Sequence, residues 1–129
     1  MPDTVVLNPE SGTGSHAPVI RTLAADYGYT VRETERPGDA IDCAQAAVEA
    51  GSTFVAAAGG DGTLNEVVRG VVAADSLGCV TVGTIPCGTG NNVAANLGIT
   101  GIEQAFEVFD GGERRRVDLP FADGRPFIN

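Results

Sequence analysis

Short apolar runs alternate along this chain with longer segments in which apolar residues recur at helical spacing. The run at residues 53–58, TFVAAA, is almost wholly apolar, which is typical of a strand buried on both faces of a sheet. The run at residues 4–7, TVVL, ends at the turn signal Asn8-Pro9. These patterns predict strands at residues 4–7, 29–34, 53–58, 80–85, 114–119 and 127–129.

Helical periodicity is clearest after Gly62. Apolar side chains there fall at i, i+3, i+4, i+7 and i+8, namely at Leu64, Val67, Val68, Val71 and Val72. An earlier helix carries apolar residues between positions 19 and 27 and ends at Gly28, a residue suited to the turn that follows a helix. Further helices are predicted at residues 39–50, 89–97 and 102–110, with Asp39 capping the first of these three.

Strands and helices therefore alternate with short connections, the order that produces a parallel sheet covered by helices on both faces. We predict an α/β fold, a three-layer sandwich with a mainly parallel, Rossmann-like sheet, built as one domain over residues 1–129. In such sheets the ligand binds at the carboxyl ends of the strands. Three glycine-rich segments fall at strand-to-helix junctions of this kind.

The charge balance narrows the classes of partner. Seventeen acidic residues face eight basic ones, all of them Arg, and the net charge is −9. Such a chain is poorly suited to bind nucleic acid or to adhere electrostatically to an anionic membrane. Acidic excess without Lys favours a halophilic protein from a salt-rich cytoplasm, and a GC-rich genome that prefers Arg codons is the alternative explanation.

Other composition signals exclude several kinds of site. The start of the chain lacks a basic segment and an apolar run, and no stretch has the length of a membrane span, so we expect a cytoplasmic domain. The three Cys residues form no CxxC pair, which supports neither a zinc site nor a disulfide framework, and reduced, mostly buried thiols are expected. His16 is the only histidine, and we expect it at the start of the first helix.

The first glycine-rich segment is NPESGTGS, residues 8–15. Gly12 and Gly14 allow backbone N–H groups to point into a cavity, as phosphate-binding loops require. A Walker A loop is excluded because the chain has no Lys. Taken alone, this segment is also consistent with a simple turn.

The second segment, GGDGTLNE at residues 59–66, carries the most information. Thr63 and Glu66 have the spacing of a capping box that opens the next helix. A helix N-terminus favours a phosphate without any Lys, and Asp61 beside it suits a role through Mg²⁺. The third segment, PCGTGNN at residues 86–92, offers glycine backbone together with the neutral hydrogen-bonding groups of Thr89 and Asn91.

In this order, NPESG, T-x-x-x-G-D-A at residues 34–40, GGDGTLNEV and P-x-G-T-G-N-N-x-A resemble the diacylglycerol kinase catalytic domain and related bacterial and archaeal lipid kinases. Sphingosine and ceramide kinases are more distant members. The resemblance covers essentially the whole chain. Since NAD kinases and phosphofructokinases share versions of GGDGT, an NAD-kinase-like small-molecule kinase remains an alternative, as does a non-catalytic nucleotide-binding module.

The resemblance implies an ATP-dependent lipid kinase that transfers a phosphoryl group to a lipid hydroxyl such as that of diacylglycerol, with ATP and Mg²⁺ as cofactors. It implies a metal or phosphate role for Asp61. The ATP contacts it implies are Asn8, Pro9, Glu10, Ser11, Gly12, Thr34, Gly60, Asp61, Gly62, Thr63, Leu64, Asn65, Glu66 and Thr89. Asn92 stands where the family usually has Asp, a change that removes one negative charge from a metal site.

Family members continue into a β-rich domain that supplies the catalytic base, a glutamate, and much of the lipid pocket. We therefore expect residues 1–129 to be the nucleotide-binding domain of a longer enzyme, without that second domain and nearly inactive alone; a naturally short protein is the alternative. In the complete enzyme the expected partners are ATP and a lipid acceptor, with peripheral membrane contact and a homodimer both possible.

Overall fold

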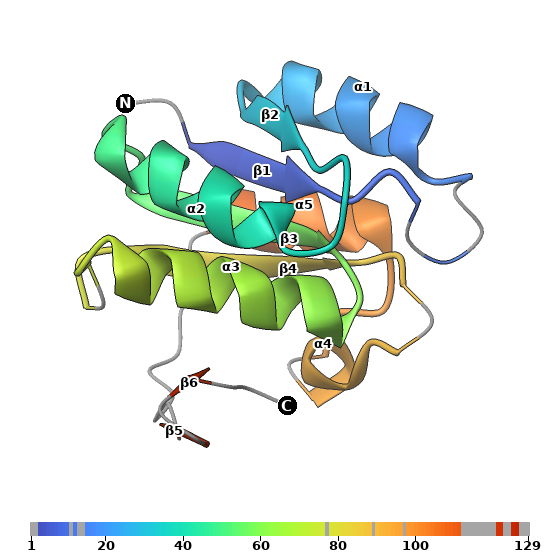
Figure 1. Ribbon diagram of the computed structural model, residues 1–129. Coiled ribbons are helices and arrows are strands. Elements are labelled where there is room, and N and C mark those ends of the chain that lie inside the picture. Colours follow the sequence, from blue (N-terminus) through green and yellow to red (C-terminus); the bar gives the residue numbers. More distant parts are fainter. Residues whose placement is uncertain are drawn as a thin grey trace.

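The computed structural model describes residues 3–10, 12, 15–76, 78–88, 90–96, 98–111, 121–122 and 125–126. Its centre is a sheet of four parallel strands in the order β2-β1-β3-β4 (Figure 1). The strands are β1 (Thr4–Leu7), β2 (Thr30–Glu33), β3 (Phe54–Gly59) and β4 (Thr81–Pro86). Every residue of β1 and β3 is buried, whereas β2 at the edge is partly exposed. The double-sided burial predicted for residues 53–58 is confirmed from Phe54 onward, whereas Thr53 is exposed and precedes the strand.

Helices cover both faces of this sheet, and the predicted three-layer α/β sandwich is confirmed. The helices are α1 (Ala17–Tyr27), α2 (Asp39–Glu49), α3 (Asp61–Ala73), α4 (Asn92–Asn96) and α5 (Ile102–Gly111). Val5 and Leu7 of β1 point into a core shared with α1 and α5. Val6, between them, points into a second core shared with α2 and α3, because successive side chains of a strand alternate between its faces. Figure 1 shows α2 and α3 side by side over one face, with α5 behind the sheet.

Aromatic side chains gather where the strands begin. Five of the seven aromatic residues pack together, with ring centroids 4.9–5.9 Å apart: Tyr27, Tyr29, Phe54, Phe106 and Phe109. A Cβ atom at Gly83 of β4 would lie 2.7 Å from the rings of both Phe54 and Phe109. Glycine at this position therefore makes room for the two rings.

The C-terminal part of the chain differs from the expectation. The strands predicted at residues 114–119 and 127–129 lie outside the described residues, as do the ends of the helix predicted at 89–97. A short antiparallel pair, β5 (Phe121–Ala122) and β6 (Arg125–Pro126), occupies a stretch in which we expected a loop. The sequence between them is Asp123-Gly124, a dipeptide that favours two-residue hairpins, so a local signal was present and overlooked.

Within the described part of the chain, no helix combines the length and the apolar run needed to cross a bilayer. The three cysteines are free thiols with different surroundings: Cys87 is buried, Cys43 is half-buried and Cys79 is exposed. The expectation of mostly buried thiols is therefore met in full by Cys87 and not by Cys79, which lies in the turn before β4.

Candidate functional site

The three glycine-rich segments meet at the carboxyl edge of the sheet. One follows β1, one joins β3 to α3 and one joins β4 to α4. Between them lies an open cleft of about 430 Å³. Its lining residues come from all three segments: Gly12, Gly60, Asp61, Gly62, Thr63, Gly88 and Gly90. Parallel strands bring these distant segments together because all four strands end at the same edge.

Most of these glycines are needed where one loop packs against another. A Cβ atom at Gly88 would lie 2.5 Å from the backbone of Gly60, and one at Gly60 would lie 2.8 Å from the carbonyl oxygen of Gly90. Gly12 has a positive φ of 60°, and its Cβ would lie 2.6 Å from the carbonyl oxygen of Cys87. The sequence suggested that these glycines admit a ligand. The structure adds a second reason, which is backbone-to-backbone contact between loops.

Gly62 is different, because a Cβ atom there would meet nothing within 4 Å. It occupies the second position of α3, which begins at Asp61 with Gly60 as its extended N-cap. The first hydrogen bond of this turn runs from the Leu64 N–H to the Gly60 carbonyl oxygen, at 3.1 Å. Among the described residues, the N–H groups of Gly62 and Thr63 have no acceptor. Within the described part of the chain, two N–H groups at the positive end of the helix dipole are thus left without a protein acceptor beside the cleft.

The predicted capping box is wrong. Thr63 is the third residue of α3 and not its N-cap, and the N-cap Gly60 makes no side-chain hydrogen bond. The helix starts earlier than the T-x-x-E pattern suggests because Gly60 adopts an extended conformation directly after β3, with φ −94° and ψ −167°. Thr63 lines the cleft. Glu66 lies half-buried one turn further along α3 and is not among the residues that line it.

Asp61 is tied to the neighbouring loop through both backbone and side chain. Its N–H donates to the carbonyl oxygen of Gly90 at 2.8 Å, and its Oδ1 accepts from the N–H of Val93 in α4 at 3.2 Å. Its own carbonyl oxygen accepts from Nδ2 of Asn65 at 2.9 Å. Sequence reasoning placed Asp61 and Asn65 at a ligand but gave no sign of these contacts within the protein. Leu64, another expected contact, is buried in the core between α2 and α3.

The third loop is closed by Asn91. Its Oδ1 accepts from the N–H of Gly88 at 3.2 Å, and its Nδ2 donates to the carbonyl oxygen of Gly88 at 2.9 Å. The amide that we expected to face a ligand thus holds the loop itself. Beside it, burial raises the pKa of the Cys87 thiol to about 11. Thr89 and the side chain of Asn92 lie outside the described residues.

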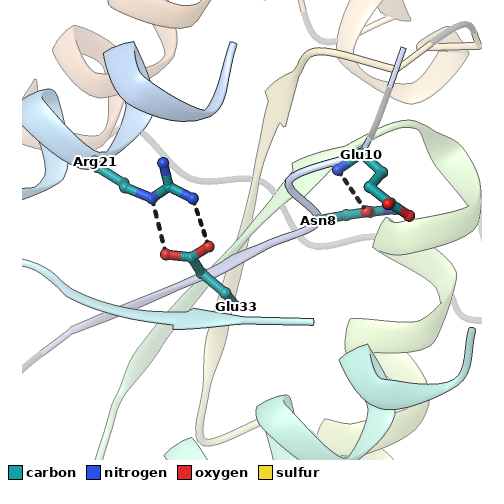
Figure 2. A network of polar contacts seen from close by, with 4 residues as sticks. All are labelled: Asn8, Glu10, Arg21 and Glu33. Atoms are coloured by element: carbon teal, nitrogen blue, oxygen red, sulfur yellow. Dashed lines mark hydrogen bonds and ion pairs between the residues drawn. The ribbon is translucent and has the colours of Figure 1, made fainter. Parts of the chain in front are cut away.

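The first loop and the end of β2 lie at the same edge. Oδ1 of Asn8 accepts from the N–H of Glu10 at 3.1 Å, which folds the chain as it leaves β1 (Figure 2). The N–H of Thr34 donates to the carbonyl oxygen of Leu7 at 2.9 Å. Asn8, Thr34 and the neighbouring Pro9 are not among the residues that line the cleft, and Ser11 lies outside the described residues.

Near β2, one ion pair was not predicted from the sequence, and the role of Asp39 was predicted wrongly. Arg21 of α1 and Glu33 of β2 form a two-pronged ion pair, with nitrogen–oxygen distances of 2.8 and 2.7 Å (Figure 2). Hydrogen bonding to Arg21 holds the pKa of the Glu33 carboxyl below its usual range. Asp39, expected to cap α2, is its first residue and instead accepts from the N–H groups of Glu35 and Arg36. It therefore closes the loop between β2 and α2.

Comparison with known proteins identifies the family. A model of the diacylglycerol kinase catalytic domain matches residues 2–121. This chain belongs to the diacylglycerol kinase catalytic-domain family.

The relatives of this family member are longer than the chain. It is 36% identical to a diacylglycerol kinase from Bacillus subtilis (strain 168), covering 97% of this chain and 43% of that protein. It is also 36% identical to a diacylglycerol kinase from Staphylococcus epidermidis (strain RP62A), in an alignment that covers 97% of this chain and 41% of that protein. The chain therefore spans less than half the length of the curated relatives that it matches.

Solved structures agree with this assignment. The crystal structure of a diacylglycerol kinase from Bacillus anthracis str. Sterne superposes with a TM-score of 0.84 at 25% identity, over 99% of this chain and 45% of that one. A phosphate-loop protein with a solution structure shares the fold alone, at 16% identity and a TM-score of 0.52. The resemblance seen in the motifs of this chain is confirmed.

The residues of the cleft are compatible with Mg²⁺ bound chiefly through a ligand. Across the described residues, no three His, Cys, Asp or Glu side chains gather as a metal centre. Asp61 is the acidic residue that lines the cleft. Mg²⁺ in phosphate-transfer sites commonly takes one or two protein carboxylates, phosphate oxygens and water. A single carboxylate beside helix N–H groups that lack an acceptor in the described part of the chain fits that pattern.

Proposed function

We propose that this chain forms the nucleotide site of an ATP-dependent lipid kinase that transfers a phosphoryl group to a lipid hydroxyl such as that of diacylglycerol. Family membership and the names of the relatives support the reaction class. The observation that carries the nucleotide site is the start of α3, where Gly62 and Thr63 line an open cleft and their N–H groups have no acceptor among the described residues. Phosphate oxygens are the acceptors that such a helix start favours.

Two contributions to phosphoryl transfer would come from this cleft. Backbone N–H groups fixed in advance would hold the phosphates and stabilise the charge that develops on them, without reorganising during the reaction. Asp61 would hold Mg²⁺, which neutralises phosphate charge when it is bound. We propose that Asn8, Glu10, Thr34 and the neighbouring loop contact the nucleoside part, since they lie at the same sheet edge beside the cleft.

Activation of the lipid hydroxyl requires a general base. Asp61 is a poor candidate because its Oδ1 already accepts a hydrogen bond from α4. We propose that the base and most of the lipid pocket belong to the part of the longer relatives that has no counterpart in residues 1–129. This predicts that the 129-residue chain binds ATP but transfers phosphate to lipid hardly at all.

Calorimetric titration with ATP in high salt, with and without Mg²⁺, tests the nucleotide site. Saturable binding that tightens with Mg²⁺ is expected, and Asp61→Ala should lose it. Asp110→Ala, which removes an exposed acid on α5, is the matched control for that variant and should leave binding unchanged. Absence of saturable binding under both conditions would contradict the proposed site.

A phosphorylation assay with vesicles containing diacylglycerol tests the assignment of the base. Little or no labelled phosphatidic acid is expected from residues 1–129. Turnover comparable with that of a full-length relative would show that this chain holds its own base.

A further inference from the structure

The side chain of Asp61 reaches out of its own helix to the start of α4. Its Oδ1 accepts from the N–H of Val93, the second residue of α4, at 3.2 Å. First-turn N–H groups have no partner within their own helix, and a side-chain oxygen normally caps them from the residue just before it. Here that oxygen comes from α3, 32 residues earlier in the sequence.

A second set of contacts holds the same two segments together. The Asp61 N–H donates to the Gly90 carbonyl oxygen at 2.8 Å, and the backbones of Gly60 and Gly88 pack too closely to admit a Cβ atom. On the other side, Asn65 fixes the carbonyl oxygen of Asp61 at 2.9 Å. The position of Asp61 relative to α3 and to the third loop is thus defined from several directions.

Helix α4 packs against the hydrophobic cores on both faces of the sheet. It is only five residues long, yet Val93 packs into the core of α2 and α3 while Ala94 packs into the core of α1 and α5. Both side chains are at least nine-tenths buried. A helix this short is not stable by itself, so its placement depends on such tertiary contacts and on its cap.

We propose that Asp61 is a positioning residue: its Oδ1 holds the start of α4, and with it the loop containing Gly88 and Gly90, beside the cleft by accepting a hydrogen bond. The negative charge is not required for this task. The effect on α4 is independent of any ligand, whereas its consequence for nucleotide binding rests on the proposed function.

Asp61→Asn and Asp61→Ala separate the two properties of the side chain. Asn keeps an oxygen at the place of Oδ1 and loses the charge, whereas Ala loses both. Amide hydrogen exchange of the Val93 N–H, measured by NMR without nucleotide, reports the contact directly. We expect exchange about tenfold faster in Asp61→Ala, the factor expected for loss of a typical cap, and nearly unchanged exchange in Asp61→Asn. Asp26→Asn removes an exposed charge from α1 and is the control.

Unchanged exchange in Asp61→Ala would overturn the proposal. Equally fast exchange in Asp61→Asn and Asp61→Ala would overturn the acceptor role, because charge would then be essential. An ATP titration of the same proteins adds a separate result: Asp61→Asn should keep Mg²⁺-free binding and lose the gain from Mg²⁺, and Asp61→Ala should lose both. If the wild type binds no ATP while the exchange pattern is as expected, the proposed nucleotide site fails and the positioning role stands.

Discussion

The two ends of the sheet are built in opposite ways. At the amino end, aromatic side chains fill the space between α1, α5 and the strands, and Gly83 makes room for the rings of Phe54 and Phe109. At the carboxyl end, glycine backbones pack directly against one another, and polar side chains such as Asp61 and Asn91 hold the loops by hydrogen bonds to backbone groups. The first end buries apolar area and stabilises the fold. The second gives up that area and places beside a cleft the N–H groups of Gly62 and Thr63, which have no acceptor among the described residues.

Phe106→Ala should produce the largest loss of stability, because this fully buried ring stacks on Tyr27 and contacts Tyr29 and Phe109. We expect the free energy of unfolding to fall by about 3–5 kcal/mol, as for other buried aromatic truncations. Chemical denaturation in high salt measures this, with Phe106→Leu as a milder variant. A loss below about 1 kcal/mol would mean that the aromatic end is not the main source of stability.

Thiol reactivity separates the buried loop from the surface. With a pKa raised from 9.0 to about 11, Cys87 has a thiolate fraction at neutral pH about a hundredfold below its ordinary one. A disulfide reagent added to the native protein should therefore label exposed Cys79 promptly and Cys87 only very slowly. Equal rates at the two residues, read by mass spectrometry, would show that the glycine loops open freely.

Gly88→Ala should open the carboxyl end, since the new methyl group would collide with the backbone of Gly60. We expect a loss of about 1–3 kcal/mol in unfolding free energy, weaker ATP binding and faster labelling of Cys87. Gly111→Ala, where a Cβ atom meets nothing within 4 Å, is the matched control and should be neutral. If the two variants had the same unfolding free energy, ATP affinity and rate of Cys87 labelling, the packing of Gly88 against Gly60 would not matter for this end of the fold.

Gly62→Ala tests the cleft separately from loop packing, because Gly62 lines the cleft and a Cβ atom there would meet nothing within 4 Å. Stability should stay the same or rise by up to about 1 kcal/mol, since Ala is the better helix former. ATP affinity should fall about tenfold, because the added methyl group would keep a phosphate from reaching the backbone N–H groups and so weaken hydrogen bonds to a charged ligand. Denaturation and calorimetry on one preparation give both values; unchanged affinity would exclude this helix start as the phosphate site.

The smallest effect is expected for Glu33→Gln, which breaks the exposed ion pair with Arg21. The pair contributes stability above the ordinary pKa of 4.5, and this contribution is lost as the pH falls through the lowered pKa of the folded protein. The variant should therefore be slightly less stable than the wild type near neutral pH, and this difference should disappear as the pH falls and Glu33 of the wild type becomes protonated. Thermal melts of both proteins between pH 3 and 7 measure this, in low salt because screening of the ion pair is weakest there. Identical pH profiles for the variant and the wild type would contradict the prediction.

The sequence predicted the elements well where periodicity reports burial. The apolar TFVAAA run predicts a buried strand and the apolar stripe of α3 predicts a helix, and both elements are confirmed. The meeting of three glycine segments also followed from parallel topology. What failed depends on contacts between distant residues: Thr63 resembles a cap only locally, while Gly60 and the amide of Asn91 take their roles from the neighbouring loop. The bond from Val93 to Asp61 spans 32 positions and leaves no local pattern.

Backbone NMR of the 129-residue chain during ATP addition tests the central claim most directly. Saturable shifts are predicted for the N–H groups of Gly62 and Thr63 and for Gly12 and Gly90 across the cleft, while Phe54 and Phe106 at the amino end stay unchanged. Shifts concentrated at the aromatic end, or none at Gly62 and Thr63 at saturating ATP, would contradict the account.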